Sequence, residues 1–174
     1  MNSQGHISIH DTQSDYMQIK LIKIDEPAIH TDLSLTTDGD FFATIGPESN
    51  SVLIWNTNTY GIKNRIPITG FFVVKVCLIN KNIVAIILEN CTIQFYSLGN
   101  YEGTLFKEFT NIHIERINEF LYSKNFKYFF TGGEEGMIKV LDMKMLFKNF
   151  SSMQVRILYN NSNSNFIYYY FSNS

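Results

Sequence analysis

Hydrophobic residues in this chain gather in short runs that are separated by clusters of glycine, asparagine, aspartate and serine. The runs are rich in β-branched and aromatic residues, and none holds a helical period over a dozen positions. They predict strands, the clearest of which are 41–45, 51–55, 83–88, 92–96 and 137–141. Many short strands with regular turns are typical of a sandwich, a barrel or a propeller, and a fixed repeat length decides among these.

The end of an alternating strand recurs along the chain at a nearly constant interval. Successive strand ends lie 45, 41 and 45 residues apart, at His10-Asp11, Trp55-Asn56, Tyr96-Ser97 and Leu141-Asp142. The segments before these ends also align, because an apolar strand, a polar turn, a second strand, a second turn and a third strand follow in the same order. The sequence therefore contains a repeat of one β-rich unit.

This pattern resembles that of the WD40-repeat family, whose blades take ~40–45 residues. The third unit is the most similar, since His113 and Ile117 are followed by a turn at 123–125, the stretch TGGEEG and the strand IKVLD. The resemblance covers about residues 7–146 and implies an all-β fold, a WD40-type β-propeller. Each blade would be a four-stranded antiparallel sheet, and the blades would stack face to face around an axis.

About three and a half four-stranded blades are expected, so the propeller is expected to be incomplete. Residues 1–24 would form the second half of a blade. Three repeats would follow at 25–68, 69–109 and 110–158, the last of them degenerate at its end, with a low-complexity tail at 159–174 that shows no strand–turn pattern. Because a closed propeller has about four to eight blades, we expect the chain to be a fragment of a larger propeller protein or to be completed by a partner.

The resemblance also implies a set of structural positions in each blade. Family members often carry a hydrogen-bonded set made of a histidine before the first strand, a serine or threonine on the second, an acidic residue in the next turn and a tryptophan. The third unit offers His113, Thr131 and Glu135, but Leu141 replaces the tryptophan.

The other units keep less of this set. The first complete unit keeps Thr44 and Trp55 but has Glu26 where the histidine belongs, and the middle unit keeps almost none. We therefore expect apolar packing to hold the blades together. Turns are predicted at Asp38-Gly39 and at Gly136, a hairpin position that needs a positive φ. The remaining repeat positions are Asp11, Tyr96, Gly132 and Asp142.

Composition and charge say more about the possible partners and location of the protein than about its fold. The 174 residues carry a net charge of −2 without a basic cluster, which argues against nucleic acid as a partner. The N-terminal segment lacks the apolar core of a signal peptide, and no apolar run reaches the ~18 residues of a membrane span. Cys77 and Cys91 are expected to be free thiols in a reducing compartment. These features predict a cytoplasmic location.

No catalytic, cofactor-binding or metal-binding set is evident in the sequence, so no cofactor is expected. Glu134 and Glu135 form an acidic pair, but on a hairpin turn such side chains usually face solvent. A propeller-type enzyme would need carboxylates or histidines that recur on the inner strands, which are expected to carry apolar residues. None of the four histidines lies at ligand spacing with Cys, Asp or Glu; they are His6, His10, His30 and His113.

The expected function is that of a non-catalytic scaffold that binds other proteins or peptides through the propeller faces. The alternative is a propeller subunit of an RNA-processing or chromatin complex, and a propeller-type enzyme is the weakest candidate. The stretch TGGEEGMIKVLDMKM is similar to a blade of the large WD-repeat proteins of centriole walls and cilia. That resemblance implies protein partners in a microtubule-based assembly and a location at the cilium or basal body.

Overall fold

The fold is known from a computed structural model, which describes residues 6–22, 32–46, 48, 50–125, 127–143, 152–159 and 167–172. The last two ranges are described by their backbone alone. The regular elements of this part of the chain are strands, arranged in four antiparallel sheets. Within the described residues, no helix is long and apolar enough to cross a membrane.

The four sheets follow one another in chain order. A hairpin pairs β1 (Ile7–His10) with β2 (Gln18–Ile22). The first blade contains β3 (Leu33–Leu35), β4 (Phe41–Ile45), β5 (Ser51–Asn56) and β6 (Ile62–Pro67). The middle blade contains β7 (Val73–Asn80), β8 (Ile83–Leu88), β9 (Ile93–Ser97) and β10 (Thr104–Phe109). The third blade contains β11 (Ile117–Ser123), β12 (Tyr128–Gly133), β13 (Met137–Asp142), β14 (Ser152–Tyr159) and β15 (Ile167–Ser172).

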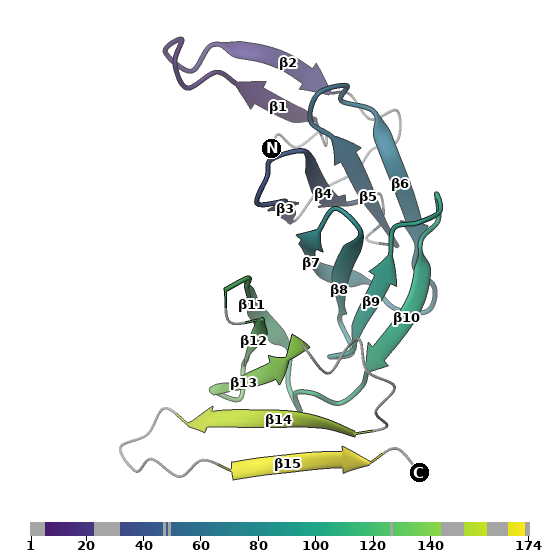
Figure 1. The fold of residues 1–174 in the computed structure, drawn as a ribbon, viewed down its shortest axis with the longest axis vertical. Coiled ribbons are helices and arrows are strands. Elements are labelled where there is room, and N and C mark those ends of the chain that lie inside the picture. The colour runs from purple at the N-terminus through teal and green to yellow at the C-terminus, as the bar shows by residue number, and fades with distance from the viewer. Residues whose placement is uncertain are drawn as a thin grey trace.

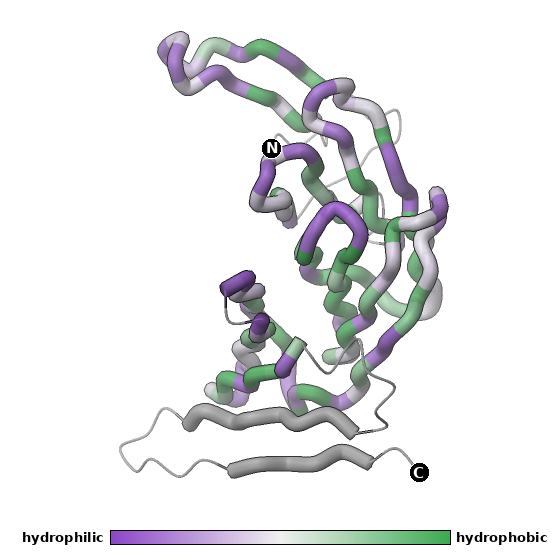
Figure 2. Tube along the Cα trace, viewed as in Figure 1, coloured by the Kyte–Doolittle hydropathy of each residue, from purple (hydrophilic) through white to green (hydrophobic). Residues whose placement is uncertain are grey.

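Every sheet is a simple meander in which each strand pairs with the next along the chain. The sheets succeed one another along an arc, and β3, β7 and β11 lie on its inner side while β6 and β10 lie on its outer side (Figure 1). Hydrophobic segments lie within the strands, and hydrophilic segments lie at many of the turns between them (Figure 2). The arrangement places the first strand of each blade around a common axis.

Irregularities of the strand pairing recur at the same place in successive sheets. The inner strands of the middle and third blades each bulge near their start, where Val74 and Asn118 are the extra residues. The last strand of the hairpin, β2, and the fourth strands of the first two blades, β6 and β10, bulge opposite the repeated strand end. The extra residues are Ile19, Lys63 and Phe106. A bulge bends and twists a strand locally, so the repeat is visible in the shape of the backbone as well as in the sequence.

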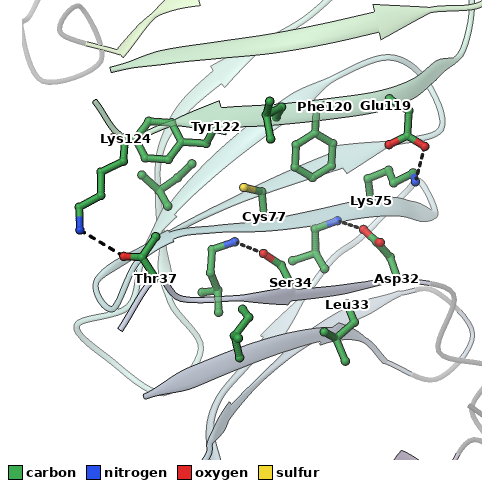
Figure 3. Close-up of a pocket in the computed structure, with 15 residues that line it drawn as sticks. Asp32, Leu33, Ser34, Thr37, Lys75, Cys77, Glu119, Phe120, Tyr122 and Lys124 are labelled. Atoms are coloured by element: carbon green, nitrogen blue, oxygen red, sulfur yellow. Dashed lines mark hydrogen bonds and ion pairs between the residues drawn. The ribbon is translucent and has the colours of Figure 1, made fainter. Parts of the chain in front are cut away.

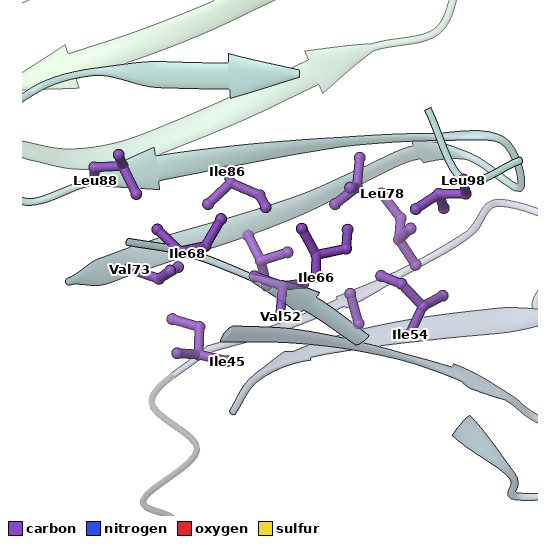
Figure 4. Close-up of a cluster of buried hydrophobic side chains, with 13 residues drawn as sticks. Ile45, Val52, Ile54, Ile66, Ile68, Val73, Leu78, Ile86, Leu88 and Leu98 are labelled. Atoms are coloured by element: carbon purple, nitrogen blue, oxygen red, sulfur yellow. The ribbon is translucent and has the colours of Figure 1, made fainter. Parts of the chain in front are cut away.

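The hydrophobic core lies between neighbouring sheets. One cluster packs β4, β5 and β6 against β7 and β8, and includes Ile45, Ile54, Ile66 and Ile86 (Figure 4). A second joins the middle and third blades, where Phe95 meets Phe129 with ring centroids 5.8 Å apart. A third joins the hairpin to the first blade. Because strands are covered on both faces, runs such as 83–88 are apolar without alternation.

The C-terminal segment, which was expected to show no strand–turn pattern, contains a strand. The strand β15 lies within it and pairs with β14 from Ser152–Ser172 to Ile157–Ile167, which gives the third blade a fifth strand. The biased composition of the segment obscured this strand, although the stretch IYYYF is rich in the β-branched and aromatic residues that favour strands. An unpaired edge on β14 supplies the hydrogen-bonding partner.

Candidate functional site

The third blade contains a buried cluster of polar side chains. His113 contacts Thr131 through Nε2, 2.7 Å from Oγ1, and Glu135 through Nδ1. The side chain of His113 is fully buried and that of Glu135 is 5% exposed. Lys139, whose ammonium lies 3.9 Å from Glu135, donates a hydrogen bond to the carbonyl of Ile112. The cluster therefore joins the segment before β11 to β12, to the β12–β13 turn and to β13.

Burial dominates the electrostatics of this cluster. Desolvation lowers the pKa of His113, and the hydrogen bond and charge of Glu135 oppose that shift. Desolvation likewise lowers the pKa of Lys139, again opposed by Glu135. The second carboxylate oxygen of Glu135 is buried and has no hydrogen-bond partner among the described residues. The cluster thus consists of groups engaged with one another. Glu135, which the resemblance implied as a partner of His113 and Thr131 and which its turn position suggested would face solvent, has a buried side chain.

A close approach of the backbone accommodates this cluster at Gly133. A Cβ atom at that position would collide with the carboxylate of Glu135 and the imidazole of His113. Gly132, the preceding repeat position, leaves ordinary space, since the nearest atom to its Cβ would be 3.9 Å away. The hairpin closes at Gly136, whose φ of +76° confirms the expected positive value. Two glycines of TGGEEG therefore have different structural roles: Gly133 leaves room for the buried cluster, and Gly136 supplies the positive φ of the hairpin turn.

The first blade holds a different part of the expected polar set. Trp55 donates a hydrogen bond from Nε1 to Oγ1 of Thr44 over 3.0 Å, and both side chains are buried. The indole also stacks on Phe42, with ring centroids 5.9 Å apart. A Cβ at Gly46, which follows Thr44 by two residues, would collide with the hydroxyl of Ser51 in its present rotamer. The Glu26 position lies outside the described residues, as does His30.

The middle blade has an apolar residue where the other two have threonine. By strand register, Ile86 is the equivalent of Thr44 and Thr131, and it is fully buried. Tyr96, at the repeated strand end, is half-buried, and desolvation raises its pKa. Its hydroxyl donates to Gln94 over 3.0 Å. This blade is held by apolar packing, which was expected for all of them.

The remaining repeat positions lie at exposed turns or strand ends. Asp11 accepts hydrogen bonds from the backbone of Gln13 and the hydroxyl of Ser14, and the latter contributes most to lowering its pKa. His10 is exposed and contacts the carbonyl of Tyr16. Asp38 and Gly39 lie in the β3–β4 turn, where Gly39 has a φ of +76°. Asp142 lies half-buried at the end of β13. These residues shape turns and converge on no common point.

An accessible groove of about 290 Å³ lies along the inner strands β3, β7 and β11. Charged residues occupy equivalent register positions here, with Asp32 directly before β3, Lys75 on β7 and Glu119 on β11. The expectation that the inner strands carry apolar residues is therefore wrong at this position. Lys75 bridges to Glu119 over 3.4 Å at one end of the groove, and Lys124 donates to Thr37 over 3.2 Å at the other. Figure 3 shows the Cys77 thiol between β3 and the rings of β11, which are Phe120 and Tyr122.

Sequence reasoning missed this groove because its residues come from three blades separated by about forty residues each. Only the repeat register shows that Asp32, Lys75 and Glu119 share a position. The groove offers few reactive groups, since burial raises the pKa of Cys77 to about 12 and keeps the thiol protonated. Among the residues that the structure describes, no three His, Cys, Asp or Glu side chains gather in a way that could hold a metal ion.

Comparison with known proteins identifies the fold. No protein-family model and no curated protein matches the sequence. A crystal structure of the β-propeller domain of Cps50 (Swd1) from Myceliophteria thermophila is similar, with a TM-score of 0.69 and 10% sequence identity. The match covers 97% of this chain and 66% of that one, so the chain spans less than two thirds of its structural neighbour. The fold is that of an incomplete β-propeller, as the repeat predicted.

Proposed function

We propose that this chain belongs to a non-catalytic WD40-repeat scaffold that binds other proteins or peptides through the inner rim of its propeller. One contrast carries the proposal. The polar side chains that could do chemistry, His113, Glu135 and Lys139, are buried in contacts with one another. Accessible polar and apolar groups instead line the groove along the inner strands. An accessible groove without a reactive constellation suits binding.

The surface of this groove favours a protein partner over nucleic acid. Leucines project beside it, and Leu121 on β11 is 66% exposed. Charged groups of both signs flank them, which gives the mixed apolar and polar character of a protein interface. A phosphate backbone would require clustered lysines and arginines, whereas Lys75 is paired with Glu119.

Site-specific photo-crosslinking tests this proposal in cells. A photoreactive phenylalanine analogue would replace Leu121 on the inner strand, and Leu105, a 44% exposed residue of the outer strand β10, would serve as the matched control. We expect discrete protein adducts from position 121 and few from position 105. Equal labelling at the two positions, or crosslinks to RNA, would contradict a protein-binding inner rim.

The cellular setting is proposed on narrower grounds. We propose that the chain contributes blades to a larger propeller in the cytoplasm, and that the TGGEEGMIKVLDMKM stretch assigns it to a ciliary or basal-body assembly. Imaging a tagged full-length protein beside a basal-body marker in ciliated cells tests the location. Signal at the basal body supports it. A diffuse cytoplasmic signal would remove the ciliary version, and a nuclear signal would favour the RNA-processing or chromatin alternative.

A further inference from the structure

The inner strand of the middle blade has its open edge capped by the preceding blade. The backbone N–H groups of Val76 and Leu78 point out of the ladder of β7 toward β3. The carboxylate of Asp32 accepts from Val76 over 2.8 Å, and the hydroxyl of Ser34 accepts from Leu78 over 2.9 Å. An Asp-Leu-Ser segment therefore satisfies two donors that would otherwise be unpaired.

The inner strand of the third blade has the same backbone arrangement. Val76 pairs with Ile86 in register as Phe120 pairs with Thr131, and both strands carry the same bulge beforehand. The N–H groups of Phe120 and Tyr122 therefore point out of their ladder toward β7, as those of Val76 and Leu78 point toward β3.

The caps, however, are missing at this second edge. The residues of β7 that occupy the places of Asp32 and Ser34 are Lys75 and Cys77. An ammonium group cannot accept a hydrogen bond, and a thiol accepts only weakly. Within the described ranges, the hydrogen bonds seen include no side-chain oxygen on the N–H of Phe120 or Tyr122.

The groove beside this edge presents a row of donors. Lys75 stands at one end and Lys124 at the other, and the strand register places the N–H groups of Phe120 and Tyr122 between them. The partner of Lys75 is loosely held, because the side chain of Glu119 is 81% exposed. An exposed pair of this kind contributes little, so an incoming carboxylate can replace Glu119. The two N–H groups that lack a side-chain acceptor, beside a lysine whose partner can be replaced, call for an acidic and hydroxylic occupant.

We propose that the groove along β11 binds an extended partner segment with the pattern Asp-X-Ser or Asp-X-Thr. Its carboxylate accepts from the N–H of Phe120 and displaces Glu119 from Lys75, and its hydroxyl accepts from the N–H of Tyr122. The bound segment thus supplies from the groove the kinds of acceptor that Asp32 and Ser34 supply one blade earlier. This inference rests on the proposed function and names the partner chemistry that the scaffold recognises.

Amide hydrogen exchange in the free protein provides the first test. We expect the amides of Phe120 and Tyr122 to exchange at least tenfold faster than those of Val76 and Leu78, although both pairs occupy the same register. Equally slow exchange at all four amides would overturn the inference, because it would mean that the β11 edge is already capped. Protection that appears only as the protein concentration rises would also overturn it, since a second copy would then be the occupant.

Peptide binding provides the second test. The probe is a fluorescein-labelled peptide Asp-Leu-Ser-Leu-Thr, the sequence of residues 32–36, followed by fluorescence anisotropy with the whole chain. We expect binding that protects the amides of Phe120 and Tyr122, at least fivefold weakening by Lys75→Ala, and tighter binding by Glu119→Gln, which removes the competing carboxylate. Glu108→Gln on the outer strand is the matched control and should change nothing.

The outcomes separate this inference from the proposed function. Equal affinity for the peptide Ala-Leu-Ala-Leu-Thr, or insensitivity to Lys75→Ala, would overturn the acidic-segment inference. If crosslinks from position 121 persist in that case, the scaffold function stands and only the partner chemistry is wrong. If position 121 gives no adducts, the proposed function itself fails.

Discussion

The first and third blades place different parts of one polar set at equivalent positions. In the first blade, Thr44 accepts from the indole of Trp55. In the third, the equivalent Thr131 contacts His113, and Leu141 fills the place of the tryptophan. A buried donor needs an acceptor but not a particular residue, so either part of the set can be satisfied on its own. The middle blade, with Ile86 at the threonine position, shows that neither part is indispensable to the fold.

The comparison predicts the largest losses of stability at the repeated strand ends, where Trp55 in the first blade and Leu141 in the third are buried. Trp55→Ala should lower the free energy of unfolding by about 3–5 kcal/mol, because it removes a buried indole, its stack on Phe42 and its hydrogen bond. Leu141→Ala in the third blade should cost about 2–4 kcal/mol, since a smaller side chain is lost. Denaturant unfolding followed by circular dichroism measures both. A loss below about 1 kcal/mol for Trp55→Ala would mean that this residue is no core anchor.

Alanine substitutions at the equivalent glycines Gly133 and Gly46 should differ in how much they destabilise the chain. Gly133→Ala should destabilise the chain by about 1–3 kcal/mol, because the new methyl group meets both the imidazole of His113 and the carboxylate of Glu135. Gly46→Ala should cost less, since the hydroxyl of Ser51 can rotate away.

A third glycine supplies the control for these two substitutions. The nearest heavy atom to a Cβ at Gly99 would be 3.9 Å away, so Gly99→Ala should lie within about 0.5 kcal/mol of the parent. The same unfolding curves compare the three variants. A harmless Gly133→Ala would show that the buried cluster can rearrange freely.

The two threonines test whether the parts act independently. Thr44→Val and Thr131→Val should each cost about 1–2 kcal/mol, because each leaves a buried polar partner unpaired. The double variant should show the sum of the two losses to within about 0.5 kcal/mol, since the residues lie in separate blades. Thr131→Val combined with Glu135→Gln should instead be non-additive. A strong coupling between Thr44 and Thr131 would indicate that the blades share one network.

The smallest expected effect is a pH dependence specific to the third blade. Burial lowers the pKa of His113, so the folded chain takes up a proton at this site less readily than the unfolded chain. The stabilisation is therefore complete above the unfolded pKa of about 6.5 and is lost as the pH falls below it. Melting temperatures between about pH 5 and pH 7.5 should show this loss in the parent and in the exposed-site control His10→Gln, but less in His113→Gln.

The sequence predicted the repeat in all the blades but the side-chain contacts in only some of them. The steps between strand ends predicted the propeller because a 41–45 residue period is carried by many positions at once. The contact of Thr44 with Trp55 could be anticipated because both lie within one unit. For Glu135 the resemblance and the turn chemistry disagreed: the first implied a contact with His113 and Thr131, whereas a hairpin turn by itself favours a solvent-facing carboxylate, and only the packing of the blade decided between them.

The sequence by itself determined the strands, the turns and the repeat, because alternation and turn chemistry depend on neighbours along the chain. Only the tertiary structure decided which residues meet across blades. Asp32 lies forty-four residues from Val76, yet its carboxylate caps that backbone N–H. At the equivalent N–H groups of β11, the residues of β7 at the capping positions are Lys75 and Cys77, and the described part of the chain shows no side-chain oxygen bonded to these groups. That difference depends on which blade follows which around the axis, and stacking alone sets it.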